Sequence, residues 1–118
     1  MATTSKVIYD TLVELRASAA LTANVDGTGQ LLYAYGLNKA VAIVTAKSGT
    51  SPTLDIKIQE CATLGGSYTD IAAFAQITAV GSYELVFRAV QPYIRYSATV
   101  GGTTPSFTTW IIVTTPDK

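Results

Sequence analysis

Acidic side chains, one cysteine and seven tyrosines are the residues of this chain that could do chemistry or hold a ligand. The sequence contains no histidine, so the usual general base and the commonest metal ligand are both missing. Cys61 therefore has no imidazole to activate it as a nucleophile, and a lone cysteine is ordinarily a small buried residue. We expect no catalytic residue, no metal and no cofactor.

One carboxylate pair remains as a candidate for acid–base chemistry. Asp55 and Asp70 lie in two neighbouring extended segments, so a hairpin could bring them together. A pair of glycosidase-type acids also needs a deep cleft and two well-separated pKa values, which a small domain with short loops rarely provides. The sequence therefore predicts a protein that is not an enzyme.

The tyrosines offer another kind of site, because an aromatic ring has a flat apolar face and a polar tip. Tyr33, Tyr35, Tyr68 and Tyr93 lie near expected turns, where they could be stacking platforms for sugar rings. The aromatic residues at strand positions, by contrast, are expected in the core; they are Tyr83, Phe87, Phe107 and Trp110. Carbohydrate recognition is therefore kept as an alternative function.

The composition indicates a protein whose surface is largely covered by other protein subunits. The 118 residues suit one domain. Charged residues make up only 14%, against a usual share of about a quarter, and eight basic residues balance eight acidic ones. Few charges and no net charge are unusual for a soluble monomer, so copies of the chain or a larger partner are expected to cover much of the surface. The alternative is an ordinary β-protein whose many hydroxyl groups keep it in solution.

Several partners are disfavoured by the same composition. A chain without a basic cluster lacks the phosphate contacts on which nucleic-acid affinity depends. The start of the chain carries no signal-peptide pattern, and the longest apolar run, Ala40 to Val44, is far too short to span a bilayer. One cysteine forms no internal disulfide, which is compatible with synthesis in a reducing cytoplasm. We expect neither nucleic acid nor membrane as a partner.

The stretch from Ser51 to Ile71 predicts a β-hairpin. Its first strand alternates strictly from Leu54 to Gln59, with apolar residues on one face and polar residues on the other. Pro52 suits the start of such a strand. A turn follows at Leu64-Gly65-Gly66-Ser67, and β-type composition resumes after it.

The turn that precedes this hairpin recurs later in the chain. Gly49-Thr50-Ser51-Pro52-Thr53-Leu54 is echoed by Gly102-Thr103-Thr104-Pro105-Ser106-Phe107. Two copies are too few for a repeat protein. Because turn geometry restricts residue choice, the echo predicts two similar corners that join strands in the two halves of one β-sandwich.

The remaining segments predict eight or nine short strands and no interior helix. A long strand is expected from Leu15 to Val25, with Leu15, Ala17, Ala19, Leu21, Ala23 and Val25 facing inward. The segment Lys39 to Ala46 is apolar on both faces, as in a central strand covered on each side. Short strands are also expected at 31–35 and 74–78. The prediction is an all-β, single antiparallel β-sandwich over residues 15–118, jelly-roll-like, preceded by an extended N-terminal arm over residues 1–14.

The arrangement of these motifs resembles that of tailed-bacteriophage head decoration, or cement, proteins. The resemblance covers roughly residues 36–113. It rests on Pro52, Leu54, Glu60, Gly65-Gly66, Tyr68-Thr69-Asp70-Ile71, Tyr93-Ile94-Arg95-Tyr96 and Thr104-Pro105-Ser106-Phe107. One position departs from the pattern, because Leu64 stands where such hairpins often carry an aspartate before Gly-Gly. That departure weakens any case for cation binding at the turn.

The resemblance implies a jelly-roll β-sandwich that binds a preassembled capsid, often as a trimer. The expected function is thus a structural virion protein that binds the outside of the assembled capsid and stabilises it. The expected partners are the major capsid protein and further copies of the chain. The apolar segment Lys6, Val7, Ile8 and Tyr9 in the arm is the candidate contact with the capsid or a neighbouring subunit, because exposed contiguous apolar patches usually mark interaction sites. A carbohydrate-binding or fibre-tip β-sandwich used in host recognition is the alternative.

Overall fold

The computed structural model describes residues 13–32 and 36–114. All of its regular structure is β-strand, as the sequence predicts. The strands are β1 (Val13–Leu21), β2 (Val25–Asp26), β3 (Gln30–Leu31), β4 (Gly36–Cys61), β5 (Thr69–Ala73), β6 (Gly81–Ala89) and β7 (Tyr93–Thr114). Among the described residues there is no helix long and apolar enough to cross a membrane.

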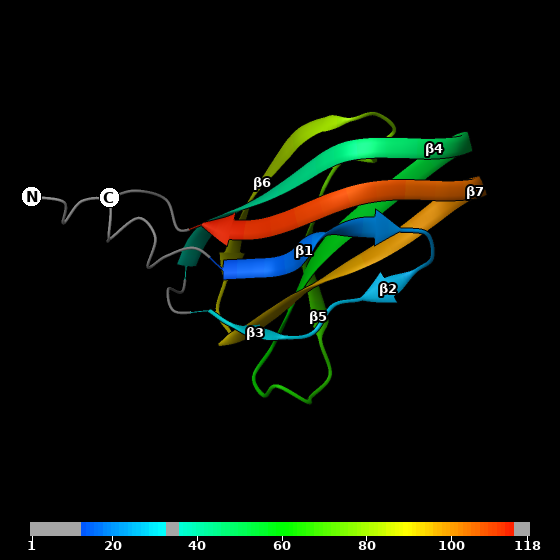
Figure 1. Cartoon of the computed structure of the whole chain (residues 1–118). Coiled ribbons are helices and arrows are strands. Elements are labelled where there is room, and N and C mark those ends of the chain that lie inside the picture. Colours follow the sequence, from blue (N-terminus) through cyan, green and yellow to red (C-terminus); the bar gives the residue numbers. More distant parts are fainter. Residues whose placement is uncertain (1–12, 33–35, 115–118) are drawn as a thin grey trace, which may run out of the picture.

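A single antiparallel sheet, folded back on itself, forms both layers of the β-sandwich. Strands β4 and β7 pair with each other along nearly their whole length and pass through both layers. In layer 1, the halves 36–48 of β4 and 103–114 of β7 lie between β6 and β1. In layer 2, the other halves, 53–61 of β4 and 93–101 of β7, lie between β5 and the short strands β2 and β3. Figure 1 shows the red half of β7 between β1 and the teal half of β4, with the gold and green halves of the same strands behind them.

The predicted paired corners are where both long strands fold. Gly49 and Gly102 have positive φ angles of 113° and 102°, and each lies on one side of the pair formed by Thr50 and Thr103. A Cβ atom on Gly49 would lie 2.7 Å from the backbone oxygen of Thr104, too close for any side chain. Glycine is therefore required at these positions both for the backbone conformation and for the close approach of the two strands.

The core lies between the two layers and takes every second residue of β4 and β7. Layer 1 contributes Ala40, Ala42, Val44, Phe107, Ile111 and Val113, and layer 2 contributes Leu54, Ile56, Ile58, Ile94, Tyr96 and Ala98. Phe87 from β6 is buried there as expected, together with Leu15, Leu21, Leu32, Phe74, Ile77 and Ala89. This period of two is the pattern of strands that bury one face only.

The hairpin predicted between Ser51 and Ile71 is confirmed. Leu54, Ile56 and Ile58 are fully buried, and the end of β4 pairs with β5 across the Gly65-Gly66 turn. One register shift between Ile58 and Gln59 marks a bulge in this pairing. The following segment 74–78 is not a full strand, because it contributes a single bridge between Ile77 and Leu54.

The long strand predicted from Leu15 to Val25 extends too far, and most of its predicted inward face is wrong. Strand β1 ends at Leu21, and only Leu15 and Leu21 face the core, while Ala17, Ala19, Ala23 and Val25 are exposed. The register with β7 shifts twice, between Glu14 and Arg16 and between Arg16 and Ala19. Each shift breaks the alternation of faces that the sequence pattern assumed.

The segment Lys39 to Ala46 is covered on one face only, contrary to the prediction. Ala40, Ala42 and Val44 are buried, whereas Val41 and Ile43 are partly exposed on the outside of layer 1. The number of strands agrees with the expected eight or nine once the two halves of β4 and β7 are counted separately. Strand β3 (Gln30–Leu31) overlaps the strand expected at 31–35 at Leu31 only, and residues 33–35 lie outside the described part.

Candidate functional site

The outer face of layer 2 carries a hydrogen-bonded polar network, which consists of Asp26, Lys57, Gln59, Asp70, Arg95 and Ser97. Gln59 lies at its centre. The Gln59 side-chain oxygen accepts a hydrogen bond from Arg95 Nε at 2.7 Å, and its amide nitrogen donates to Asp70 Oδ1 at 2.7 Å. Lys57 Nζ donates to the other oxygen of Asp70 at 3.1 Å. On the far side, Ser97 Oγ donates to Asp26 at 2.6 Å, and Arg95 Nη2 lies 3.7 Å from the same carboxylate.

The polar network spans layer 2 from β2 through β7 and β4 to β5. The hydrogen bonds from Gln59 and Lys57 to Asp70 hold the pKa of that carboxyl below its ordinary value, because both favour the charged form. Tyr68 lies against the network, with its ring 4.2 Å from the Arg95 guanidinium carbon. Its hydroxyl donates to the backbone oxygen of Leu64, and partial burial raises the pKa of Tyr68. These side chains are already engaged with one another, so they fix the surface of layer 2 and leave few free groups for a ligand.

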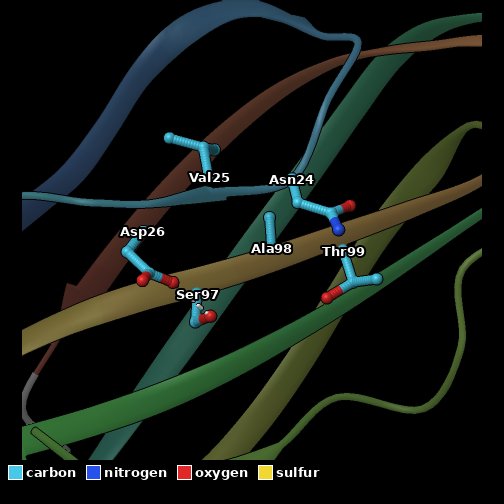
Figure 2. Close-up of a pocket in the computed structure, with 6 residues that line it drawn as sticks. All are labelled: Asn24, Val25, Asp26, Ser97, Ala98 and Thr99. Atoms are coloured by element: carbon cyan, nitrogen blue, oxygen red, sulfur yellow. Dashed lines mark hydrogen bonds between the residues drawn. The ribbon is translucent and has the colours of Figure 1, made fainter.

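A shallow polar groove lies beside the network, between β2 and β7. Figure 2 shows its lining residues, three from the β2 segment opposite three from β7. They are Asn24, Val25, Asp26, Ser97, Ala98 and Thr99, and the groove encloses about 170 Å³. The Asn24 side-chain oxygen accepts a hydrogen bond from the backbone nitrogen of Val100 at 2.9 Å. This bond ties the loop before β2 to β7, so the Asn24 side chain already has a structural role. The groove is lined by polar and small apolar side chains and by no aromatic ring.

The outer face of layer 1 has the opposite character. Outward-pointing positions of β4, β6 and β7 place large apolar side chains next to one another, with Val41 opposite Ile112 and Ile43 opposite Trp110. Val86 and Leu37 extend the surface and are 59% and 50% exposed. We call this surface the apolar outer face and define it by Leu37, Val41, Ile43, Val86, Trp110 and Ile112. Lys39, Glu84 and Arg88 also point outward from this layer, so its apolar residues are most continuous along the paired strands β4 and β7.

Trp110 was expected in the core, and this expectation is wrong. Its side chain is partly exposed on the apolar outer face, and its indole nitrogen donates to Glu14 Oε2 at 2.6 Å. Tyr83 is partly buried and packs against the core, with its hydroxyl donating to the backbone oxygen of Ala79. Sequence reasoning missed the apolar outer face because it assigned the apolar residues on both faces of 39–46 to the interior.

The other residues singled out from the sequence are not brought into one site. Asp55 and Asp70 have different partners, because Gln76 donates to Asp55 while Gln59 and Lys57 bind Asp70. Cys61 is buried. Within the described residues no three carboxylate, cysteine or histidine side chains gather as a metal site would require. The arm residues Lys6, Val7, Ile8 and Tyr9, together with Tyr33 and Tyr35, lie outside the described part.

The motif residues behind the phage resemblance have structural roles. Glu60 accepts hydrogen bonds from the backbone nitrogens of Val90 and Gln91 at 3.0 and 3.2 Å, and so ties the β6–β7 loop to the end of β4. Arg95 and Tyr68 belong to the outer surface of layer 2, as described above. The motif therefore describes how the sandwich is built rather than what it binds.

Comparison with known proteins gives likenesses in structure only. No family model matches the sequence, and no curated protein sequence matches it. The crystal structure of the SPBc2 prophage-derived protein YomS is similar to 88% of this chain and 92% of that chain, with a TM-score of 0.50 and 14% identity. The CBM22-1 and GH10 modules of xylanase 10B from Clostridium thermocellum, complexed with xylohexaose, are similar with a TM-score of 0.49 and 11% identity, over 93% of this chain and 27% of that chain. At these identities the likeness concerns the fold alone.

Proposed function

We propose that this protein is a structural subunit of a tailed-phage virion that binds the outside of the assembled capsid and stabilises it. In this proposal the protein is located on the capsid surface, its partners are the major capsid protein and further copies of itself, and it has no enzymatic activity. Support comes from the resemblance to decoration proteins in the residues that build the sandwich, and from the likeness of the fold to that of a prophage-derived protein.

The observation that carries the proposal is the apolar outer face. In a lone subunit, Val86 is 59% and Leu37 50% exposed, on the same outer face as Trp110, Val41 and Ile112. The Lys39–Glu84 ion pair lies on this face between Val86 and Val41. An outer face with this many large apolar side chains usually marks contact with another protein. With only 14% charged residues and no net charge, the chain also has little electrostatic repulsion to keep copies or partners apart.

Capsid binding is tested with purified protein and with capsids of the parent phage from which accessory proteins have been removed. We expect saturable binding, with a fixed number of copies per capsid, and a higher temperature of capsid disruption when the sites are full. Binding that does not saturate, or that leaves the disruption temperature unchanged, would contradict a stabilising role.

Carbohydrate recognition is the second candidate, and the polar groove between β2 and β7 favours it. Thr99 offers a hydroxyl group to a small polyhydroxylated ligand, and Asp26, Ser97 and Asn24 offer the hydrogen-bonding capacity that their bonds to one another and to Val100 leave over. The groove has no aromatic lining, and Tyr68, one of the expected platforms, already lies against Arg95. A glycan array probed with the same protein separates the candidates, because specific glycan binding without capsid binding would replace the first proposal by the second.

A further inference from the structure

The apolar outer face has a size and outline that a second protein surface could cover completely. Layer 1 is four strands wide, in the order β1, β7, β4 and β6, and β6 is nine residues long. With about 4.8 Å between strands and about 3.3 Å per residue, the whole outer surface of layer 1, charged and hydroxyl side chains included, measures about 570 Å². Two such faces packed together would remove about 1,100 Å² from water, near the lower limit for a specific interface.

Charged residues of both signs lie among the apolar residues and at the edges of the face. Lys39 and Glu84 form an ion pair at 3.5 Å on the surface between β4 and β6, and Glu14 accepts the Trp110 indole hydrogen bond on the β1 side. Arg88 points outward from the end of β6 and pairs in the sheet with Leu37. The face thus carries two basic and two acidic side chains, so a partner surface with one dominant sign would meet repulsion as well as attraction.

We infer that the apolar outer face packs against the same face of a second copy of this chain. This inference rests on the proposed structural role and names one partner within it. Two identical faces related by a two-fold axis meet with equal numbers of basic and acidic groups, so the pairing is electrically balanced. Sheet packing at a separation of about 10 Å would bury the Trp110, Val41 and Ile112 side chains between the two copies.

The test is sedimentation velocity of the full chain from about 1 to 200 μM, with two matched variants. Val86→Lys places a charge on the apolar outer face at an exposed strand position. Thr99→Lys makes the same change in charge at an exposed strand position on the outer face of layer 2. Melting temperatures of all three proteins show whether the variants remain folded, and Val86→Glu replaces Val86→Lys if the lysine variant does not fold.

We expect the wild-type protein to change from one copy to two within this range. The Val86 variant should weaken association at least tenfold, while Thr99→Lys should associate as the wild type does. The inference is overturned if the wild type stays a single copy at 200 μM, if both variants associate equally well, or if a three-copy species forms that the Val86 substitution leaves unchanged.

Capsid binding by the same proteins separates this inference from the proposed function. A wild-type protein that stays a single copy but binds capsids saturably would overturn the pairing and leave the structural role standing. A protein that pairs through the apolar outer face but binds no capsid would overturn the structural role and leave the pairing standing.

Discussion

Ser51 and Thr104 hold the same left-handed backbone conformation, with φ angles of 48° and 47°, in the two corners that fold β4 and β7. They lie on adjacent strands, on opposite sides of the pair formed by Thr50 and Thr103. This conformation is unfavourable for residues with a Cβ atom, above all for a β-branched one such as threonine. The two corners hold each other in place, and together they determine that one sheet becomes two layers.

Gly102→Ala is expected to destabilise the protein by about 1 to 3 kcal/mol, because it forces a side chain into the left-handed region. Its Cβ would also lie 2.7 and 2.8 Å from the backbone oxygens of Ser51 and Thr50. Gly65→Ala is the matched control, since no atom lies within 4 Å of the added methyl group. Urea unfolding of both variants measures the difference, and equal losses would contradict the account of the corner.

Phe107→Ala should destabilise the protein more than Trp110→Ala, although tryptophan is the larger side chain. Phe107 is fully buried between the layers, so its truncation should cost about 3 to 5 kcal/mol. Trp110 is partly exposed on the apolar outer face, so the loss for the single subunit should be clearly smaller. Chemical unfolding at low protein concentration, where copies do not associate, is the measurement. A larger loss for Trp110→Ala would place it in the core after all.

Asp70 should make folding stability depend on acidity. The pKa of Asp70 is lower in the folded protein than its ordinary unfolded value of about 3.8. Its contribution to the free energy of unfolding is therefore fully present above pH 3.8 and is lost as the pH falls through the lower, folded pKa. Asp70→Asn should therefore lose stability at pH 6 and show a smaller further loss between pH 4 and pH 2.5 than the wild type. Urea unfolding across this range measures both slopes, and parallel slopes would contradict a role for Asp70.

Deletion of residues 1–9 tests the predicted arm contact, which includes Lys6, Val7, Ile8 and Tyr9. The arm is expected to bind the capsid or a neighbouring subunit, so the shortened protein should keep its melting temperature and bind capsids more weakly. A lowered melting temperature with capsid binding retained in the cold would instead mean that these residues complete the domain's own sheet. Thermal unfolding and capsid co-sedimentation of the same protein decide between the two outcomes.

The sequence by itself determined the class of fold and its central hairpin. Alternation from Leu54 to Gln59 is a local property, because successive residues of a strand point to opposite faces whatever the strand pairs with. The echoed corners were also visible, because only a few residue types tolerate positive φ angles. The same alternation places Phe107 and Trp110 on opposite faces, so the sequence could have predicted the outward position of Trp110. It was expected in the core because it is an aromatic residue at a strand position.

Tertiary structure decided what depends on residues distant in the chain. The exposure of Ala17 and Ala19 follows from register shifts against β7, and no local pattern in β1 announces them. The polar network likewise needed the pairing that sets Gln59 opposite Arg95 in β4 and β7. Residues 39–46 are apolar on both faces of the strand. This pattern is expected if the protein's own chain covers both faces, and it is equally expected if a partner covers one of them. Only the arrangement of the layers showed that the second face is left on the outside, because coverage is a property of the whole fold and not of the strand.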